Sequence, residues 1–550
     1  YTTLFRSLYS LQVYDRVIPT KGLQTLTVLT VGVGIVLIID FVIKMTRSNL
    51  LENFIKGADL EISQKIFNRL LEVRMDQFPA SVGTLSSQVR SYEVIRSFAS
   101  SATLYMIIDA PFAILFVLVI MGIAGPLVAF VAIAFFILSL ALGLIFKRKI
   151  ENHTMNSAAF SNMKLGLLVE TVSGAESIKS AGAGWQMLTR WNRLNRQAVN
   201  DDAQTRHYTE TSSYLAGFMQ QTSYILLVGT GAYIASTTND LTTGGIIACS
   251  ILSGRVLAPI SMLPGLIVQW GHAKIALKNL ERVYALERDN HAVSRPIRPT
   301  ILQGSYLLTK VRFAYHGRPE TVAIDRLSIE PGEKVGILGG IGAGKSTLLK
   351  LLAGLYRPQH GQILLDALDL QHISRHTLSE RLGYLPQNIH LFSGSIRDNL
   401  LLGLSDVEES EILNACNKTG LIDLIRSHPK GLDLEITEGG AGVSGGQKQL
   451  IGITRLMLSK PDIWLLDEPT ASMDERYEYF ALSGLQQEIS KKQTLVLVTH
   501  KPKLLSLVNR LVVITPEGVA IDGPRDIVIN KLMQNSSTAH NQDKSRGTNQ

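Results

Sequence analysis

The sequence predicts a multidomain protein, in which an all-α bundle of transmembrane helices is followed by an α/β domain with a phosphate-binding loop. Three observations predict this fold class. A chain of 550 residues is too long to fold around a single hydrophobic core, so at least two domains are expected. Hydrophobic residues make up 46% and charged residues 18%, and the mean hydropathy is +0.17, which is typical of membrane spans. In the last part of the chain, short β-branched runs alternate with helical stretches.

Five apolar runs approach or exceed the ~20 residues that cross a bilayer core. They cover residues 23–43, 104–123, 127–146, 214–235 and 243–268. A buried helix of a soluble protein accounts for one such run, but not for five. Residues 1–14 resemble the end of a further span, which would give six spans with the first truncated. Because the chain opens with Tyr1 and shows no signal-peptide pattern, we expect its true beginning to be missing.

The charges between the apolar runs predict the orientation of the spans. Residues 125–126 and 236–242 join neighbouring spans without any Lys or Arg. Residues 44–103 hold eight basic residues and residues 147–212 hold nine. The positive-inside rule therefore places these two long segments in the cytoplasm. Both read as helices that turn near Gly83 and near Gly174.

Domain boundaries follow from changes in composition. We expect a transmembrane domain over residues 1–281, a polar linker with two prolines over 282–300, a soluble domain over 301–533 and a disordered tail over 534–550. Cys249 and Cys416 have no cysteine or histidine neighbours in sequence, so we expect buried, reduced thiols and no metal site. The net charge of +8 is spread along the chain, which argues against nucleic-acid binding.

The soluble domain contains the motif GGIGAGKST, which begins at Gly339 and ends at Thr347. It follows a predicted strand, Lys334–Leu338, and opens a predicted helix over residues 347–355, the context that a P-loop requires. The glycines allow backbone N–H groups to surround phosphates at a helix N-terminus. Lys345 should reach the β- and γ-phosphates, and Ser346 should ligate Mg²⁺.

Two further predicted strands end in polar residues. The apolar run over residues 463–466 ends in Asp467 and Glu468, and a buried parallel strand would deliver Asp467 to the Mg²⁺ beside the P-loop. Glu468 is then placed to act as the general base that activates water. The run over residues 495–498 is followed by Thr499 and His500, so His500 can approach the γ-phosphate. Two solvated acids at a surface strand end are the alternative, which the apolar run disfavours.

Further motifs resemble those of ABC exporters in type and order. The segment from Ser444 to Gln447, preceded by Val443, resembles the signature motif, which usually has Leu at its first position. Tyr315 matches the A-loop aromatic that stacks on adenine, and Gln387 matches the Q-loop. The segment that ends at Asp474 resembles the D-loop, and His500 the H-loop.

These motifs follow the order of the family over residues 301–525, and the resemblance implies roles for specific residues. It implies ATP binding by Tyr315, Gly339, Gly342, Gly344, Lys345, Ser346, Thr347, Ser444, Gly445, Gly446, Gln447 and Asp474. It implies catalytic roles for Glu468, His500 and Gln387, and Mg²⁺ coordination by Ser346, Gln387 and Asp467.

The resemblance also implies how the protein works. In this family two cassettes meet head-to-tail with two ATP molecules between them, so one chain with one cassette implies a homodimer. The presence of both Glu468 and Ser444 predicts that both sites are catalytically competent. Residues 76–85 and 169–182 resemble coupling helices, through which the cassettes act on the membrane helices.

Residues 10–19 and 109–112 resemble type I secretion ATPase/permeases, which export RTX toxins and large adhesins. This implies a bacterial inner-membrane location, a secreted polypeptide substrate, a periplasmic adaptor, an outer-membrane tunnel protein and contact with membrane lipid. Members of this group usually carry an N-terminal peptidase-like domain before the first span, which residues 1–550 do not include. Asp109 is a candidate functional acid within the membrane, or a snorkelling or helix-pairing residue.

Two alternative functions remain open at this point, and a third is disfavoured. A lipid, drug or peptide exporter would share the same scaffold, and an ATP-gated channel or regulator would use the cassette without pumping. A soluble DNA-repair or translation ATPase would need no membrane spans, and five apolar runs argue against it.

Overall fold

The computed structural model describes residues 2–78, 85, 88–89, 91–104, 110–238 and 241–534. Gly83, Asp109 and residues 535–550 of the predicted tail lie outside the described residues. The chain divides into a helical unit, Tyr1–Glu72 with Pro79–Leu286, and a second unit, Val73–Phe78 with Glu287–Gln550. The second unit contains the predicted soluble domain and is called the cassette below.

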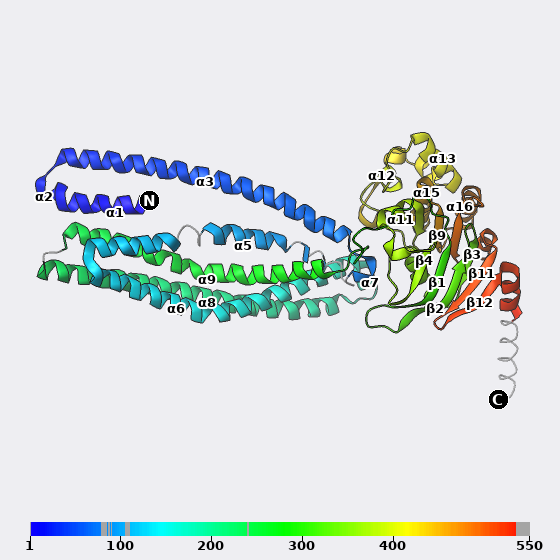
Figure 1. The fold of residues 1–550 in the computed structure, drawn as a ribbon, viewed down its shortest axis with the longest axis horizontal. Helices are drawn as coiled ribbons and strands as arrows, with labels where there is room; N and C mark the ends of the chain where they lie inside the picture. The colour runs from blue at the N-terminus through cyan, green and yellow to red at the C-terminus, as the bar shows by residue number, and fades with distance from the viewer. Residues whose placement is uncertain are drawn as a thin grey trace, which may run out of the picture. The chain divides into compact units, whose positions relative to one another are not determined.

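The helical unit is built from long helices that pack side by side (Figure 1). Apolar side chains fill the space between three long neighbouring helices, α6, α8 and α9. The helices are α1 Thr2–Gln12, a π-helical segment Val13–Val17, α2 Ile18–Thr20, α3 Leu23–Leu71, α5 Tyr92–Leu104, α6 Ala110–Ser173, α7 Ala175–Ser180, α8 Gly184–Thr237 and α9 Thr243–Ala285.

Among the described residues, three helical stretches are long and apolar enough to cross a membrane, Leu23–Leu71, Pro111–Ser173 and Thr243–Ala285. The second of these holds two predicted runs, because Gly125 (φ 77°) breaks α6 into two helices just before Pro126. The predicted run over residues 214–235 lies in α8, which falls short on hydropathy. Gln220, Gln221 and neighbouring hydroxyl residues interrupt that run.

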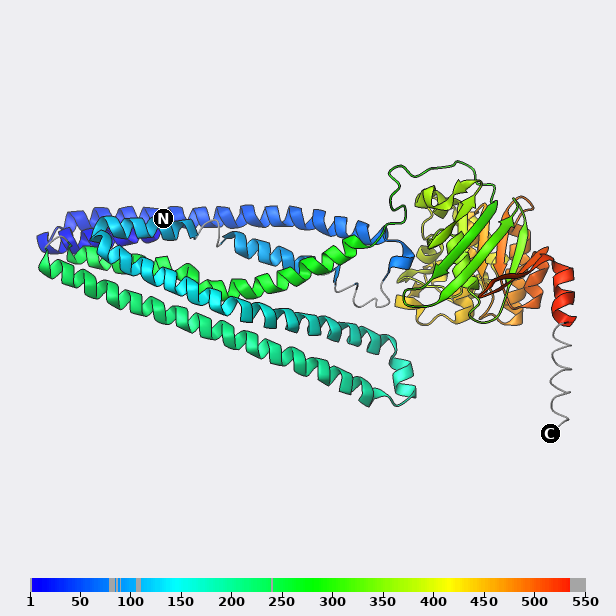
Figure 2. The same ribbon diagram turned by 60° about the horizontal axis from the view of Figure 1, so that its bottom comes forward.

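The helices continue well beyond their apolar runs, as predicted. The second part of α6 ends at Ser173, and α8 begins at Gly184 and returns antiparallel to it (Figure 2). The short helix α7 forms the turn next to Gly174, as the sequence predicted, and none of its side chains is buried. Cys249 lies buried in α9 and Cys416 buried in the cassette, both as free thiols.

The cassette contains two principal sheets. A four-stranded antiparallel sheet has the order β2-β1-β4-β5, and a six-stranded sheet has the order β12-β11-β3-β10-β9-β6. The strands are β1 Tyr306–Ala314, β2 Glu320–Ile329, β3 Lys334–Leu338, β4 His360–Leu365, β5 Leu368–Asp369, β6 Leu382–Leu385, β9 Ile463–Asp467, β10 Thr494–Val498, β11 Arg510–Thr515 and β12 Gly518–Pro524, and β7 Gly394–Ser395 pairs with β8 Glu435–Ile436.

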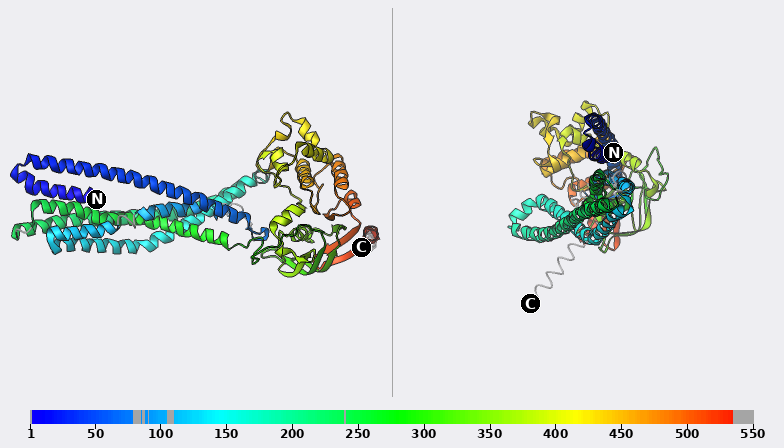
Figure 3. Two further views of the ribbon diagram at one scale, coloured as in Figure 1. Left: turned by 45° about the horizontal axis from the view of Figure 1, so that its top comes forward. Right: turned by 90° about the vertical axis from the view of Figure 1, so that its left-hand side faces the viewer.

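Helices cover the sheets, and the six-stranded sheet separates two apolar clusters, since alternate residues of β9 and β10 belong to different clusters. Figure 3 shows α12 to α15, in yellow, gathered away from the green strands β1 and β2. The helices are α10 Lys345–Leu352, α11 Arg375–Arg381, α12 Ile396–Leu400, α13 Glu409–Thr419, α14 Ile422–Ser427, α15 Gly445–Ser459 and α16 Glu475–Glu488. The helix predicted over 347–355 is α10, which begins two residues earlier and ends before Gly354 (φ 65°).

Parallel pairing brings the predicted site residues to one edge. Strands β11, β3, β10, β9 and β6 run parallel, so their carboxyl ends lie together. The P-loop follows β3, Asp467 ends β9, His500 comes two residues after β10, and Gln387 comes two residues after β6. Ligands of open α/β sheets bind outside this edge.

Candidate nucleotide-binding site

The P-loop forms a cradle of backbone N–H groups between β3 and α10. Gly342 (φ 82°) and Gly344 (φ 84°) adopt backbone angles that side chains rarely tolerate. A Cβ atom on Gly344 would lie 2.3 Å from the Thr321 carbonyl oxygen, so this position accepts only glycine. Ile341 at the loop apex is fully exposed. The open loop and the N-terminus of α10 therefore offer an anion site to solvent.

Lys345 places its ammonium group inside this loop. Its Nζ donates hydrogen bonds to the carbonyl oxygens of Gly339 (2.8 Å) and Gly340 (2.9 Å). A phosphate bound to the loop would offer the same ammonium stronger, charged acceptors. The arrangement can therefore hold a triphosphate.

Asp467 lies at the end of β9 with only 2% of its surface exposed. Burial raises the pKa of Asp467, and a hydrogen bond from Ser346 and the nearby ammonium groups of Lys350 and Lys345 oppose this rise. Its Oδ1 atom is buried without a hydrogen-bond partner. Such an orphaned carboxylate oxygen beside a serine hydroxyl fits Mg²⁺, which binds one or two protein oxygens together with substrate phosphates.

Glu468 and His500 lie next to each other at the same edge. Glu468 has φ 49°, and its N–H donates to the Val498 carbonyl oxygen at 2.9 Å, which fixes the backbone. Its Oε1 atom lies 3.5 Å from His500 Nε2. The side chain of Glu468 is 13% exposed and that of His500 is 54% exposed. A carboxylate held in this way can accept a proton from water, and an exposed imidazole can reach a terminal phosphate.

Aromatic side chains form the other side of the site. The Tyr315 hydroxyl lies 3.1 Å from Thr347 Oγ1, so the tyrosine contacts the first turn of the P-loop helix. Its ring packs edge-on against Phe313 (5.3 Å between centroids) and Tyr356 (5.9 Å). A half-buried aromatic ring beside a phosphate cradle can stack on a nucleotide base.

The signature segment caps helix α15. Ser444 Oγ accepts from Gln447 N–H at 3.2 Å, and Gln447 Oε1 accepts from Ser444 N–H at 2.9 Å, a reciprocal capping box. Ser444 and Gly445 are exposed, and a Cβ atom on Gly446 would lie 3.0 Å from the Ser472 carbonyl oxygen. The helix N-terminus therefore faces solvent as a second possible anion site.

The structure joins the signature segment to the D-loop and the acidic strand through one residue that the motifs did not identify. Gln449 in α15 accepts a hydrogen bond from Ser472 N–H (2.9 Å) and donates to the Glu468 carbonyl oxygen (3.3 Å). Asp474 caps α16 by accepting from Tyr477 N–H at 2.9 Å. Only its position five residues after Ser444, one turn into α15, could have indicated Gln449.

The predicted residues fall into two groups. One comprises the P-loop, Tyr315, Asp467, Glu468 and His500, and the other comprises the signature segment and the D-loop. Gln387 is exposed in the loop after β6, the strand that pairs with β9.

The comparisons with known proteins agree with this geometry. The family model for the ABC transporter matches residues 324–471, and that for the ABC transporter transmembrane region matches residues 2–260. Two similar curated proteins are the leukotoxin translocation ATP-binding protein LktB of Mannheimia glucosida and the alpha-hemolysin translocation ATP-binding protein HlyB of Escherichia coli O157:H7. LktB is 27% identical over 97% of this chain and 74% of its own length. HlyB is 27% identical over 96% of this chain and 75% of its own length.

A third relative and a solved structure extend the comparison. The exotoxin translocation ATP-binding protein PaxB of Pasteurella aerogenes is 28% identical over 93% of this chain and 71% of its own length. The structure of a bacterial Atm1-family ABC exporter with ATP bound has the same fold, with a TM-score of 0.86 and 20% identity over 96% of this chain and 93% of that one. The chain therefore belongs to the ABC transporters, as a multi-pass membrane protein that couples ATP hydrolysis in its cassette to transport.

Proposed function

We propose that this chain is the ATPase/permease of a type I secretion system and exports a polypeptide across the bacterial inner membrane. The observation that supports this most strongly is the extent of similarity. LktB, HlyB and PaxB, whose names describe toxin translocation, match more than nine-tenths of the chain, including its transmembrane region. Cassettes alone are shared by transporters of many cargoes, whereas similarity of the membrane helices bears on the cargo path.

The catalytic assignment follows from the positions of the site residues. Tyr315 would stack on adenine, and the loop from Gly339 to Thr347, with Gly342, Gly344 and Lys345, would hold the phosphates. Glu468 would accept the proton of the attacking water, and His500 would contact the γ-phosphate. Ser346, Asp467 and Gln387 would hold Mg²⁺, which supplies neutralisation of phosphate charge. The buried, unpartnered Oδ1 atom of Asp467 supports the metal assignment.

The working unit is proposed to be a homodimer. Each ATP would lie between the P-loop of one subunit and the signature residues Ser444, Gly445, Gly446 and Gln447 of the other, with Asp474 close by. The exposure of Ser444 and Gly445 at a helix N-terminus supports this, because a second subunit could reach them. Closing two cassettes over ATP and releasing them after hydrolysis would drive the membrane helices between two states.

The membrane arrangement is proposed from charge and length. The basic segments 44–103 and 147–212 would lie in the cytoplasm with the cassette, and the transmembrane helices would contact lipid. Residues 1–281 would form the transmembrane domain and 301–533 the nucleotide-binding domain, joined by 282–300. A periplasmic adaptor and an outer-membrane tunnel protein would complete the export path.

A secretion assay tests this proposal. A deletion strain is complemented with the wild-type chain, with Lys345→Ala, or with the control Lys491→Ala, whose side chain is exposed at the cassette surface. Lys345→Ala should remove at least one large protein from the medium, because the P-loop lysine contributes to triphosphate binding. The control should secrete normally. An unchanged set of secreted proteins, with an altered lipid composition of the membranes, would replace polypeptide export with lipid export.

A further inference from the structure

A short segment that follows the long helix α3 belongs structurally to the cassette. Residues Val73–Phe78, called the docking segment here, cluster with the cassette rather than with the helices on either side of them in sequence. Val73 forms an antiparallel bridge with Arg288, and Arg74 N–H donates to the Glu287 carbonyl oxygen at 3.0 Å. The segment is therefore held to the cassette by backbone pairing.

One ion pair of Arg74 joins the docking segment to Glu287, and a second lies within the segment itself. Its guanidinium donates to Asp76 at 2.5 and 2.9 Å and lies 2.9 Å from Glu287 Oε2. Arg74 is only 6% exposed, so these pairs are partly shielded from water. Because the docking segment directly follows α3, its position is linked covalently to a transmembrane helix.

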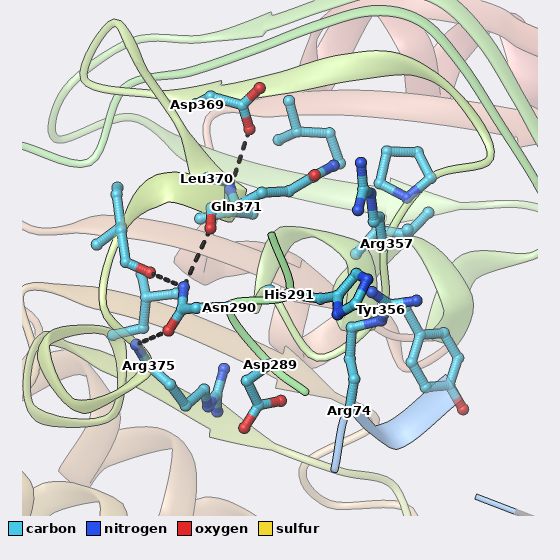
Figure 4. A pocket seen from close by; sticks show the side chains of 16 residues that line it. Arg74, Asp289, Asn290, His291, Tyr356, Arg357, Asp369, Leu370, Gln371 and Arg375 are labelled. Atoms are coloured by element: carbon cyan, nitrogen blue, oxygen red, sulfur yellow. Dashed lines mark hydrogen bonds between the residues drawn. The ribbon is translucent and has the colours of Figure 1, made fainter. Parts of the chain in front are cut away.

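Tyr356 lies where the docking segment meets the nucleotide site. Arg74 and Tyr356 line the same small cavity of about 30 Å³, room for one or two water molecules (Figure 4). On its other side, the Tyr356 ring stacks on Phe313 (5.3 Å, 20° between planes) and meets Tyr315 edge-on (5.9 Å, 86°). The Tyr356 side chain thus contacts Tyr315 and also lines the cavity that Arg74 of the docking segment lines.

Groups on both of these sides act on the pKa of the Tyr356 hydroxyl. Burial raises its pKa, and the charge of Tyr315, a hydrogen bond with Tyr315 and the nearby Asp76 carboxylate raise it further. The hydroxyl therefore stays protonated and can donate a hydrogen bond. Tyr315 in turn contacts Thr347 in the P-loop helix. Asp76 is paired with Arg74, which lines the same cavity as Tyr356, and Tyr356 contacts Tyr315, which reaches the P-loop helix.

We propose that Tyr356 is a positioning residue that holds the Tyr315 ring in place for adenine and links this geometry to the docking segment through the cavity that it shares with Arg74, the ion-pair partner of Asp76. The proposal rests on the proposed role of Tyr315 as the adenine-stacking residue. Because a fixed aromatic ring loses less freedom when it binds a base, freeing Tyr315 should weaken nucleotide binding more than it slows chemistry.

Kinetics of the full-length protein in lipid nanodiscs test the first half of this proposal. Tyr356→Phe keeps the ring but removes the hydroxyl, and should raise the KM for ATP about fivefold with little change in kcat. Tyr356→Leu should raise it about tenfold and reduce the preference for ATP over GTP. The matched control is Tyr479→Phe, at an exposed tyrosine of α16. An unchanged KM in both Tyr356 variants would overturn the proposal, as would a loss of kcat alone.

Two further variants complete the test. Tyr315→Ala should raise the KM for ATP more than either Tyr356 variant does. If it does not, the adenine role of Tyr315 fails. If Tyr315→Ala raises KM and neither Tyr356 variant does, only the positioning role is refuted.

Tyr356→Phe combined with Asp76→Asn should raise KM by less than the product of the two single effects, because both act through one contact series. Strictly multiplicative effects would contradict the link to the docking segment.

Discussion

Replacing Glu468 with glutamine tests the catalytic assignment with little disturbance of the fold. The amide has the shape of the carboxylate and tolerates the same backbone, which is fixed by the hydrogen bond from Glu468 N–H to the Val498 carbonyl oxygen. Gln449 bonds the backbone carbonyl of residue 468, so this contact with α15 also survives. What disappears is the carboxylate that we propose accepts a proton from water.

The size of the effect follows from that single loss. General-base catalysis contributes about 10²- to 10⁴-fold, so kcat of Glu468→Gln should fall by about that factor. This corresponds to about 3–5.5 kcal/mol of transition-state stabilisation. The dissociation constant for ATP should change little, because no phosphate contact of Lys345 or the P-loop is altered. Phosphate release and equilibrium binding of a fluorescent ATP analogue measure the two quantities separately.

A matched substitution separates this effect from general changes in charge. Glu475 lies in the first turn of α16, with a side chain that is 91% exposed and an ion pair to Lys503 at 3.3 Å. Glu475→Gln should leave kcat unchanged, since exposed ion pairs contribute little. If Glu468→Gln hydrolyses ATP at the wild-type rate, Glu468 is not the base and the reasoning from its position after β9 is wrong.

Three other substitutions probe the proposed metal site, the P-loop backbone and the docking segment. Burial raises the pKa of Asp467, so its ionised carboxylate destabilises the folded form, and this cost appears as pH rises through the raised pKa. Asp467→Asn should therefore raise the melting temperature in EDTA at neutral pH, while abolishing Mg²⁺-dependent hydrolysis. Gly344→Ala should destabilise the cassette by about 1–3 kcal/mol in denaturant titrations, because its Cβ meets the Thr321 carbonyl oxygen, whereas Gly340→Ala has open space and should not. Arg74→Ala leaves two carboxylates without their cation, and limited proteolysis should cut the docking segment faster than in wild type.

The sequence predicted most of the cassette because its signals are local. An apolar run followed by a glycine-rich loop predicted β3 and the P-loop, and four apolar residues before Asp467 predicted β9. Parallel strands then bring residues after their carboxyl ends to one edge, which is how Asp467 and His500 could be placed beside the P-loop. The turn at Gly174 was also predicted, because the sequence has long helical patterns before and after this glycine, where the chain must reverse direction.

Other features could not be predicted, because they depend on contacts between distant segments. Nothing local in residues 73–78 indicates that Arg74 pairs with Glu287, more than two hundred positions later. Tyr356 reads as an ordinary aromatic after a helix until its neighbours Phe313 and Tyr315 are known. The predicted span over residues 214–235 shows a limit of another kind. These residues form part of helix α8, but polar residues among them keep its hydropathy below that of the three candidate spans.

The most direct test of the account measures translocation and hydrolysis in the same vesicles. Inside-out inner-membrane vesicles that carry the chain are supplied with ATP and with the polypeptide identified by the secretion assay, and protease protection reports its entry. We predict that ATP produces protected polypeptide in wild-type vesicles, and that Glu468→Gln vesicles bind ATP but protect none. Protection of the polypeptide in vesicles that cannot hydrolyse ATP would contradict the claim that hydrolysis in the cassette powers export.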